Sequence, residues 1–400
     1  MLKGKTIVLG ITGGIAAYKG ADIASKLTQA GAKVRVIMTK SALEFVTPLT
    51  FHSLTMNSVV TNIFNMTGEK RISHVATGEA ADVVVIAPAT ANIIAKLANG
   101  IADDMLTCTV LATRAPVIVA PAMHAAMFQN PVTQENIARL KARGVTIIEP
   151  AVGRLASGGI GPGRLPETEV IIGTIQKVLG RNGDLAKRRI IVTAGGTQEP
   201  IDPVRIISNR SSGKMGYALA EAARDRGAEV VLITAPTALP KPVGVEVVAV
   251  ETASQMKEAV EKAVAQADAL LMAAAVADYQ VKSVAKSKIK KEAGGGLTLE
   301  LVRTPDILSE VKGNFVRVGF AAESEDLIEN ARKKLESKRL DLIVANDVTE
   351  PGSGFGSDTN KVTLLGKDGK AESLPLLPKR NLADKILDKV VALLAGKAGR

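Results

Sequence analysis

The stretch IIVTAGGTQEPIDPVRIISNRSSGKMG, residues 190–216, decides how this chain is organised. It begins with the apolar run Ile190-Ile191-Val192, which is typical of a buried strand. Glycines and prolines then predict a long loop, which ends in Ser211-Ser212-Gly213-Lys214 before a helix expected over 217–226. Because a glycine-rich turn and a helix N-terminus aim backbone amides at one place, we expect an anion site here.

A similar strand, turn and helix open the chain, so two nucleotide-binding-like folds follow one another. Residues 5–11 predict a buried strand, and Thr12-Gly13-Gly14 predicts a tight turn after it. A helix is expected over 15–30 and ends at Gly31, and the next strand is expected over 33–38. Further strands, separated by helical segments, are expected over 81–88, 116–120, 145–148, 229–233, 245–250, 269–273 and 341–345. This alternation predicts an α/β protein made of two doubly wound, Rossmann-like domains.

The boundary between the two domains is expected in a short polar stretch. Residues 181–188 follow a predicted helix and precede the strand at residue 190. We therefore expect one domain over 1–180 and a second over 189–400, which agrees with the domain sizes typical of a 400-residue chain.

Composition excludes several classes of protein. The single cysteine, Cys108, rules out an intramolecular disulfide and fits a reducing cytoplasm. Glycines interrupt the apolar run near the N-terminus, and no run approaches the roughly 18 residues of a membrane span, so no membrane association is expected. The net charge is +11, but aromatic residues make up only 2% of the chain, which favours small anionic substrates over nucleic acid.

Four segments of the first half carry a family resemblance. They are GGIAA at 13–17, APATAN at 87–92, PAMHAAMF at 121–128 and GRLASGGIGPGRL at 153–165. Together they resemble the flavin-dependent cysteine decarboxylases, a family that includes phosphopantothenoylcysteine decarboxylase. The resemblance implies a flavodoxin-like fold that binds FMN through Gly13, Gly14, Ile15, Thr39, Ser41, Thr90, Ala91, Asn92 and Ala122. From the residues alone, Thr90 and Asn92 are equally well explained by helix capping.

Three residues of the first half are candidates for catalysis. His74 matches the position of the family's essential histidine, although a lone histidine is more often structural. His124 stands where the family has an asparagine that holds the substrate carboxylate, and a histidine can also donate a hydrogen bond. Ser157 replaces a cysteine that donates a proton in the family, so the source of this proton is open. It lies in a flap, residues 153–164, whose five glycines and Pro162 predict irregular structure.

The second half resembles phosphopantothenate–cysteine ligase from residue 189 almost to the C-terminus. Besides the opening stretch, the matching segments are AAAVADY at 273–279, KSKIKK at 286–291, TPDIL at 304–308, VGFAAES at 318–324 and LDLIVANDV at 340–348. The resemblance implies that Asn209 assists formation of an acyl-cytidylate and Lys288 its breakdown. It places the nucleotide at Met272, Ala273, Ala274, Asp278, Lys288, Pro305, Asp306, Ile307, Leu308, Phe320, Lys334 and Lys338.

The ligand-binding assignments in this half compete with simpler ones. A solvated run of charge is an equally simple explanation of Lys288, Lys290 and Lys291. Surface exposure likewise explains Lys334 and Lys338, which are four apart on one helix face. The chain has no Gly-x-x-x-x-Gly-Lys-Ser/Thr loop, so a nucleotide would be held without one. The sequence does not distinguish CTP, the usual family nucleotide, from ATP.

A decarboxylase followed by a ligase resembles the bifunctional coenzyme A biosynthesis proteins of bacteria and archaea. The resemblance implies CTP-dependent ligation of 4′-phosphopantothenate with L-cysteine, then FMN-dependent decarboxylation of phosphopantothenoylcysteine to 4′-phosphopantetheine. It also implies Mg²⁺ or Mn²⁺, with ligands that the sequence does not identify, and a homo-oligomer, for which a dodecamer is one arrangement. Two alternatives remain at this stage: a chain in which only the ligase half is fully active and the flavin half is regulatory, and a basic nucleic-acid-binding protein.

Overall fold

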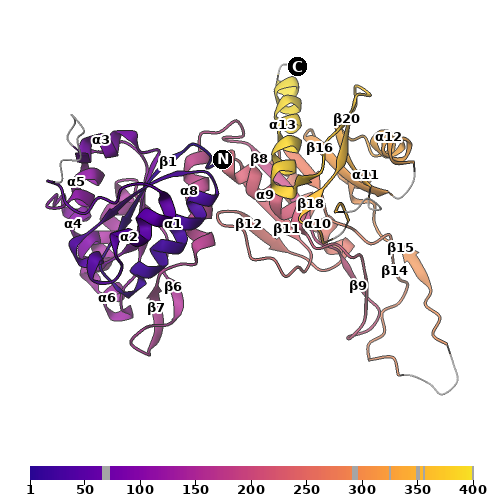
Figure 1. The fold of residues 1–400 in the computed structure, drawn as a ribbon. Helices are drawn as coiled ribbons and strands as arrows, with labels where there is room; N and C mark the ends of the chain where they lie inside the picture. Colours follow the sequence, from indigo (N-terminus) through magenta and orange to yellow (C-terminus); the bar gives the residue numbers. More distant parts are fainter. Residues whose placement is uncertain (65–72, 291–295, 324–325, 348–351, 355, 399–400) are drawn as a thin grey trace. The chain divides into compact units, whose positions relative to one another are not determined.

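The computed structural model describes residues 1–64, 73–290, 296–323, 326–347, 352–354 and 356–398. The chain divides into two compact units, Met1–Leu179 and Gly180–Arg400. Each unit is a layered α/β structure around its own sheet (Figure 1). The expected fold class, two doubly wound α/β domains in tandem, is confirmed.

The first unit contains a five-stranded parallel sheet in the order β2-β1-β3-β4-β5, which is the flavodoxin-like order. Leu9 of the central strand β1 pairs with Val36 on one side and Val85 on the other. All residues of β3 are buried, because helices cover both faces of the sheet. The strands are β1 (Thr6–Ile11), β2 (Lys33–Met38), β3 (Val83–Ala89), β4 (Val117–Pro121) and β5 (Thr146–Ile147).

Alternate side chains of these strands point to opposite layers of helices. Ile7 and Leu9 belong to a core with α1, α2 and α8, whereas Val8 and Val84 belong to a core with α4, α5 and α7. The predicted helix over 15–30 begins as a short 3₁₀ turn, and Gly31 ends it with φ +82°. The helical elements are η1 (Ile15–Tyr18), α1 (Lys19–Gln29), η2 (Lys40–Glu44), α2 (Pro48–Thr55), α3 (Ser73–Ala80), α4 (Ala91–Asn99), α5 (Met105–Ala112), α6 (Ala125–Gln129), α7 (Pro131–Ala142) and α8 (Thr168–Gly180).

The glycine-rich flap is a β-hairpin, so the prediction of irregular structure over 153–164 was wrong. Its strands β6 (Ala151–Arg154) and β7 (Ile160–Arg164) pair antiparallel and project from the unit (Figure 1). A two-stranded ribbon tolerates Pro162 because each strand is an edge strand. Gly163 has φ +132°, and a Cβ there would lie 2.1 Å from the carbonyl oxygen of Met123, so only glycine lets the hairpin approach this loop.

The second unit is built on an eight-stranded sheet in the order β12-β11-β8-β13-β16-β17-β19-β20. The first six strands are parallel and have the order of a Rossmann fold. A hairpin turn at 367–369 joins the antiparallel pair β19–β20. The strands are β8 (Arg189–Ala194), β11 (Glu229–Thr234), β12 (Glu246–Ala249), β13 (Ala269–Met272), β16 (Val316–Glu323), β17 (Leu342–Asp347), β19 (Val362–Gly366) and β20 (Ala371–Ser373).

Two sets of helices cover the two faces of this sheet. Val192 and Val344 pack with α9 (Lys214–Asp225) and α13 (Lys379–Ala398), which lie side by side (Figure 1). Ile191 and Ile343 point to the opposite face. There they pack with α10 (Ala253–Ala263), α11 (Ile307–Glu310) and α12 (Leu327–Ser337), and the turn η3 (Val264–Gln266) follows α10.

Three short ribbons complete the second unit. The expected loop after β8 contains one of them, β9 (Gln198–Pro200) paired with β10 (Ile206–Ser208). The others are β14 (Tyr279–Val281) with β15 (Leu301–Arg303), and β18 (Thr359–Asn360) with β21 (Leu377–Pro378). Strands of two or three residues give no periodic signal in the sequence, which is why they were not predicted. Within the described part of the chain, no helix is both long and apolar enough to cross a membrane.

Candidate active sites

A cavity of about 1080 Å³ lies at the carboxyl edge of the first sheet. Its walls come from the segments that follow β1, β2, β3 and β4 and from the β6–β7 hairpin. The strand order reverses at β1 and β3, which is where open parallel sheets bind ligands. All of the residues predicted to bind the cofactor line this cavity, namely Gly13, Gly14, Ile15, Thr39, Ser41, Thr90, Ala91, Asn92 and Ala122.

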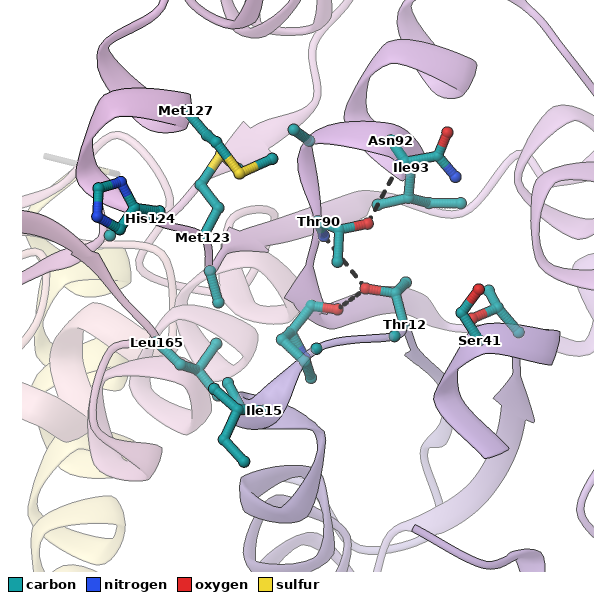
Figure 2. Close-up of a pocket in the computed structure, with 18 of the residues that line it drawn as sticks. Thr12, Ile15, Ser41, Thr90, Asn92, Ile93, Met123, His124, Met127 and Leu165 are labelled. Atoms are coloured by element: carbon teal, nitrogen blue, oxygen red, sulfur yellow. Dashed lines mark hydrogen bonds between the residues drawn. The ribbon is translucent and has the colours of Figure 1, made fainter. Parts of the chain in front are cut away.

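A chain of hydrogen bonds fixes two of these segments to each other (Figure 2). The Thr12 hydroxyl donates to the carbonyl of Pro88 at 2.7 Å and accepts from the Thr90 N–H at 3.1 Å. The Thr90 hydroxyl accepts from the Ile93 N–H at 3.4 Å and thereby caps α4. Thr90 is therefore a helix cap and a part of the cavity wall at the same time.

One polar atom of this cavity wall is buried without a hydrogen-bond partner in the described part of the chain. It is the hydroxyl oxygen Oγ1 of Thr39. Such atoms are rare, because an unpaired buried polar group costs about 1–3 kcal/mol. The next two residues, Lys40 and Ser41, also line the cavity. A ligand with a phosphate at this end would satisfy the Thr39 hydroxyl and meet a cation, so the donor set fits a mononucleotide.

His124 lies on the opposite side of the cavity from Ser41 (Figure 2). It caps α6, with Nδ1 accepting a hydrogen bond from the Ala126 N–H at 3.2 Å. Because a neutral imidazole carries only one hydrogen, this bond leaves the hydrogen on Nε2. His124 therefore has a donor available for an acceptor group of a ligand in this cavity.

Ser157 lies in the turn of the β6–β7 hairpin and lines the same cavity. Two backbone bonds close the turn, from the Leu155 N–H to the Gly159 carbonyl at 2.8 Å and from the Gly158 N–H to the Leu155 carbonyl at 2.9 Å. At the base of the hairpin, the Met123 N–H donates to the carbonyl of Gly163 at 3.0 Å. The serine is thus carried on a ribbon that is held at its base.

His74 does not line this cavity. It is half-buried in the first turn of α3, and its Nδ1 atom is buried without a hydrogen-bond partner among the residues that the structure describes. The preceding residues of its motif, Arg71 and Ile72, lie outside the described residues. Of the three candidate catalytic residues in this half, the fold brings together His124 and Ser157 but not His74.

A second cavity, of about 840 Å³, lies at the carboxyl edge of the second sheet. It is lined by residues of β13, β16 and β17, by the segments that precede α9 and follow β13, and by the start of α9 and α13. Lys288 does not line it, but Asn209 and all the other predicted nucleotide-binding residues do: Met272, Ala273, Ala274, Asp278, Pro305, Asp306, Ile307, Leu308, Phe320, Lys334 and Lys338.

Hydrogen bonds orient two polar groups of this second cavity. Asn209 Nδ2 donates to the carbonyls of Ala275 and Val276, both at 3.2 Å, which leaves Oδ1 as its acceptor for a ligand. On the other side, Lys338 Nζ lies 3.1 Å from Asp306 Oδ1. Burial by itself raises the pKa of Asp306, but hydrogen bonds from Ser309 and Lys338 hold that pKa below its usual value. Asp306 is therefore ionised at neutral pH.

Lys288 lies on an exposed arm whose backbone is clamped at the next residue. The Ile289 N–H donates to Asp202 Oδ2 at 3.1 Å, and Arg205 Nη2 donates to the Ile289 carbonyl at 3.2 Å. The Asp202 carboxylate is buried and also accepts from the N–H groups of Val204 and Arg205. Asp202 and Arg205 thus hold both peptide groups of Ile289, beside Lys288. Lys291 lies outside the described residues.

Two cavity lysines were not assigned by sequence reasoning. Lys214 lies in the loop predicted to bind an anion, but it was not singled out there. Lys379 begins α13, in a segment without a recognisable motif, so no sequence signal pointed to it. Only the fold brings these two lysines to one cavity.

Acidic residues in the second cavity are few. Asp278 and Asp306 line it, and among the described residues no group of three or more His, Cys, Asp or Glu side chains is arranged to hold a metal ion. Mg²⁺ is commonly bound by one or two carboxylates together with substrate phosphates. The donor set therefore fits a divalent ion that arrives with a nucleotide rather than an all-protein metal site.

The two sheets and their cavities define a tandem α/β protein, a flavodoxin-like unit followed by a Rossmann-like unit. Comparison with known protein families finds a match for each unit. The Flavoprotein family matches residues 1–180, and the DNA/pantothenate metabolism flavoprotein C-terminal domain matches residues 185–394.

Relatives match the chain over nearly its whole length. It is 48% identical over 399 residues to the coenzyme A biosynthesis bifunctional protein CoaBC of Bacillus subtilis, covering 98% of each chain. It is 47% identical over 410 residues to the protein of the same name from Mycobacterium tuberculosis strain H37Rv, covering 98% of this chain and 97% of that one. A crystal structure of the C-terminal domain of a CoaBC protein is 43% identical, with a TM-score of 0.46, and covers 54% of this chain and 99% of that one.

The chain belongs to the family of bifunctional coenzyme A biosynthesis proteins CoaBC. It is a bifunctional enzyme with a flavoprotein decarboxylase half and a ligase half. A chain with a merely regulatory flavin half is not favoured, because the bifunctional relatives align with both halves.

Proposed function

We propose that residues 1–180 are the phosphopantothenoylcysteine decarboxylase, residues 189–400 the phosphopantothenate–cysteine ligase and residues 181–188 their linker. The ligase joins 4′-phosphopantothenate to L-cysteine, and the decarboxylase converts the resulting phosphopantothenoylcysteine to 4′-phosphopantetheine. The observation that carries this proposal is that, in each unit, residues from separate motifs converge on one cavity at the carboxyl edge of the sheet. The single cysteine supports a cytoplasmic location.

The ligase reaction has two steps. The substrate carboxylate attacks the α-phosphate of the nucleotide, so that an acyl-nucleotide forms and pyrophosphate leaves. The cysteine amine then attacks the acyl carbon and loses a proton as the nucleoside monophosphate departs. We assign the first step to Asn209, whose Oδ1 is left to accept a hydrogen bond from an N–H or O–H group of the substrate and so to position it. We assign the second step to Lys288, whose ammonium group stabilises charge on the departing phosphate.

The nucleotide of the ligase is proposed to be CTP, accompanied by Mg²⁺ or Mn²⁺. Phe320 offers a surface for the base, and Lys334 in α12 and Lys338, the residue that follows α12, offer positive charge for the phosphates. Asp278 would hold the metal ion, which neutralises phosphate charge when it is bound. Measuring the ligase KM with CTP and with ATP tests the choice of nucleotide, and a lower KM for ATP contradicts it.

The cofactor of the decarboxylase is proposed to be FMN, held by the nine cavity residues from Gly13 to Ala122 that were predicted for it. The buried and unpaired Thr39 hydroxyl supports this site. When bound, FMN supplies the oxidation of the substrate thiol that makes loss of CO₂ feasible, and it later returns the electrons. The Nε2–H of His124 holds the substrate carboxylate before it leaves as CO₂.

The position of His74 makes a homo-oligomer part of the proposal. His74 lies outside the cavity of its own chain, so the acid–base role proposed for it places it at the cavity of a second copy. Mixed oligomers test this role. Co-expression of His74→Asn chains with His124→Ala chains should restore decarboxylation that neither variant shows alone. Failure of the mixed oligomers to recover activity contradicts the shared site.

The proton at the last step of decarboxylation comes from a group other than Ser157. The enethiolate that remains after CO₂ is lost must gain a proton on carbon, and a serine hydroxyl is a far weaker acid than a cysteine thiol, whose pKa is about 8.5. We therefore propose that Ser157 positions the hairpin and that a nearby acid or water donates this proton.

The whole reaction can be tested on the purified full-length protein. A bound flavin should give a yellow visible spectrum. Incubation with 4′-phosphopantothenate, L-cysteine and CTP should then give 4′-phosphopantetheine, identified by mass. A colourless protein contradicts the flavin site, whereas a yellow protein that forms no phosphopantothenoylcysteine contradicts the ligase.

A further inference from the structure

A second pair of lysines lines the ligase cavity, apart from the pair on α12. Lys214 is the first residue of α9 and Lys379 the first residue of α13. The two helices cover the same face of the sheet, so their N-terminal ends and these two side chains meet at its carboxyl edge. Lys379 is only 8% exposed, which is unusual for a lysine.

The contacts of these two lysines leave an excess of positive charge. Lys214 Nζ lies 2.7 Å from Asp358 Oδ1 and donates to the Gly356 carbonyl at 2.8 Å. Lys379 Nζ donates to the carbonyl of Ser357, which carries no charge. The Asp358 carboxylate is itself 89% exposed, so solvent screens it strongly. Among the described residues, two ammonium groups are thus matched by a single screened carboxylate.

Holding these two ammonium groups close together is energetically unfavourable unless an anion binds between them. Burial lowers the pKa of Lys379, and the nearby charge of Lys214 lowers it further. A buried ammonium group needs either an ionic partner or release of its proton. A phosphate group between the two lysines would supply the missing charge, and the backbone N–H groups at the start of α9 and α13 would face it.

The lysines of α12 cannot serve this part of the cavity. Lys334 and Lys338 come from a helix that packs with Ile343 and Ala345. Lys214 and Lys379 come from helices that pack with Val344, and neighbouring residues of a strand point to opposite faces. The cavity therefore has one lysine pair on each side of the sheet edge. Two lysine pairs match a reaction in which both the nucleotide and the second substrate carry phosphate.

We propose that Lys214 and Lys379 form a second phosphate-binding site in the ligase cavity, on the side of α9 and α13. This inference rests on the nucleotide cavity proposed above and extends it with two residues. The ligand chemistry is a phosphate group, and the ligase offers two sources of it: the polyphosphate chain of the nucleotide and the phosphate of 4′-phosphopantothenate.

The test compares Lys214→Met and Lys379→Met with Lys385→Met in the full-length protein. Lys385 is an exposed residue of α13 that does not line the cavity, so its variant controls for the loss of a lysine from this helix. The KM is measured separately for CTP and for 4′-phosphopantothenate, and inorganic pyrophosphate is used as a competing anion. Each cavity variant should raise the KM for one of the two substrates by about tenfold or more, the value of one charge-assisted hydrogen bond, and Lys379→Arg should recover part of it.

The outcomes separate the two sources and separate this site from the proposed function. A raised KM for CTP with weaker inhibition by pyrophosphate assigns the site to the nucleotide, and a raised KM for 4′-phosphopantothenate alone assigns it to the second substrate. Unchanged values for both substrates overturn the proposal. A wild-type protein without ligase activity would instead overturn the proposed function. An unchanged circular dichroism spectrum and melting temperature in each variant show that the ligase unit has folded.

Discussion

The two units place a cavity at the same edge of a parallel sheet but build its walls differently. In the first unit, hydrogen bonds among Thr12, Pro88 and Thr90 tie the loops to each other and to the sheet. In the second, positive charge comes from helices on both faces of the sheet, while an arm that is clamped at Ile289 carries Lys288 outside the cavity. A resident cofactor needs one fixed wall, whereas two successive steps on phosphate-bearing substrates need cations from several directions.

Both units also leave one predicted catalytic residue outside the cavity, and here too they differ. His74 is half-buried on a helix, with an unpaired Nδ1 atom among the described residues, whereas Lys288 is exposed on an extended arm. A helix holds the backbone of His74, whereas the backbone beside Lys288 is held by Asp202 and Arg205 at Ile289. Substitutions of His74, Lys288 and Asp202 test whether this difference between a helix and an arm affects the two reactions.

The largest effect is expected for His74→Asn. Loss of a positioned acid–base group should reduce decarboxylation by about 10²–10⁴-fold while flavin content stays unchanged. The matched control is His52→Asn, since His52 is exposed and its ring nitrogen lies 3.0 Å from the Asn57 carbonyl oxygen. If the His74 variant loses flavin or unfolds while its activity per flavin persists, His74 is a structural residue.

Lys288→Gln should have the next largest effect. Amide formation should fall by about 10²–10³-fold, the cost of removing one group that stabilises developing charge, while pyrophosphate release continues. Lys290→Gln is the control, because Lys290 is exposed on the same arm on the other side of Ile289. Wild-type formation of phosphopantothenoylcysteine by the Lys288 variant would show that the arm only carries surface charge.

Asp202→Asn should have a moderate effect, because it acts through the position of Lys288. Its ligase turnover should fall by about tenfold, since misplacing a catalytic group by about 1 Å can cost up to ~10²-fold. Exchange of the Ile289 amide hydrogen should become faster, and decarboxylation should not change. Equal exchange in the variant and the wild type would show that the clamp does not order the arm.

The same clamp predicts a pH dependence. Burial by itself raises the pKa of Asp202, but hydrogen bonds from the N–H groups of Val204, Ile289 and Arg205 hold that pKa below the usual value of 3.8. A lowered carboxyl pKa stabilises the folded form above the usual value, and this contribution is lost as the pH falls below it. Exchange of the Ile289 amide, corrected for its intrinsic pH dependence, should therefore stay slow from neutral pH down to about pH 4.

The smallest effect is expected for Ser157→Cys. If another group donates the proton, the product should stay 4′-phosphopantetheine and the rate of decarboxylation should change by less than about tenfold, well below the effect of removing an acid. Products are identified by mass after anaerobic incubation with phosphopantothenoylcysteine. A wild-type product two hydrogens lighter, together with normal product from the cysteine variant, would show that the serine is responsible for a missing proton.

Much of this molecule could be predicted from short stretches of sequence. Apolar runs such as 5–11 and 190–192 predicted strands, because a parallel strand is buried on both faces and needs no polar residues. The residues predicted to bind FMN directly follow strands or begin helices, and the doubly wound fold brings such positions to one edge. The β6–β7 hairpin was missed because its glycines conceal any period of two.

The sequence by itself determined the order of the two units, their parallel sheets and the edge at which each cavity lies, because local patterns of apolar residues and glycines decide these features. Only the tertiary structure decided that His74 and Lys288 lie outside the cavities and that Lys214 and Lys379 share one. These facts depend on which faces of the sheet α9, α12 and α13 cover and on the bonds from Asp202 and Arg205 to Ile289. Such contacts join residues far apart in the chain, and no local pattern records them.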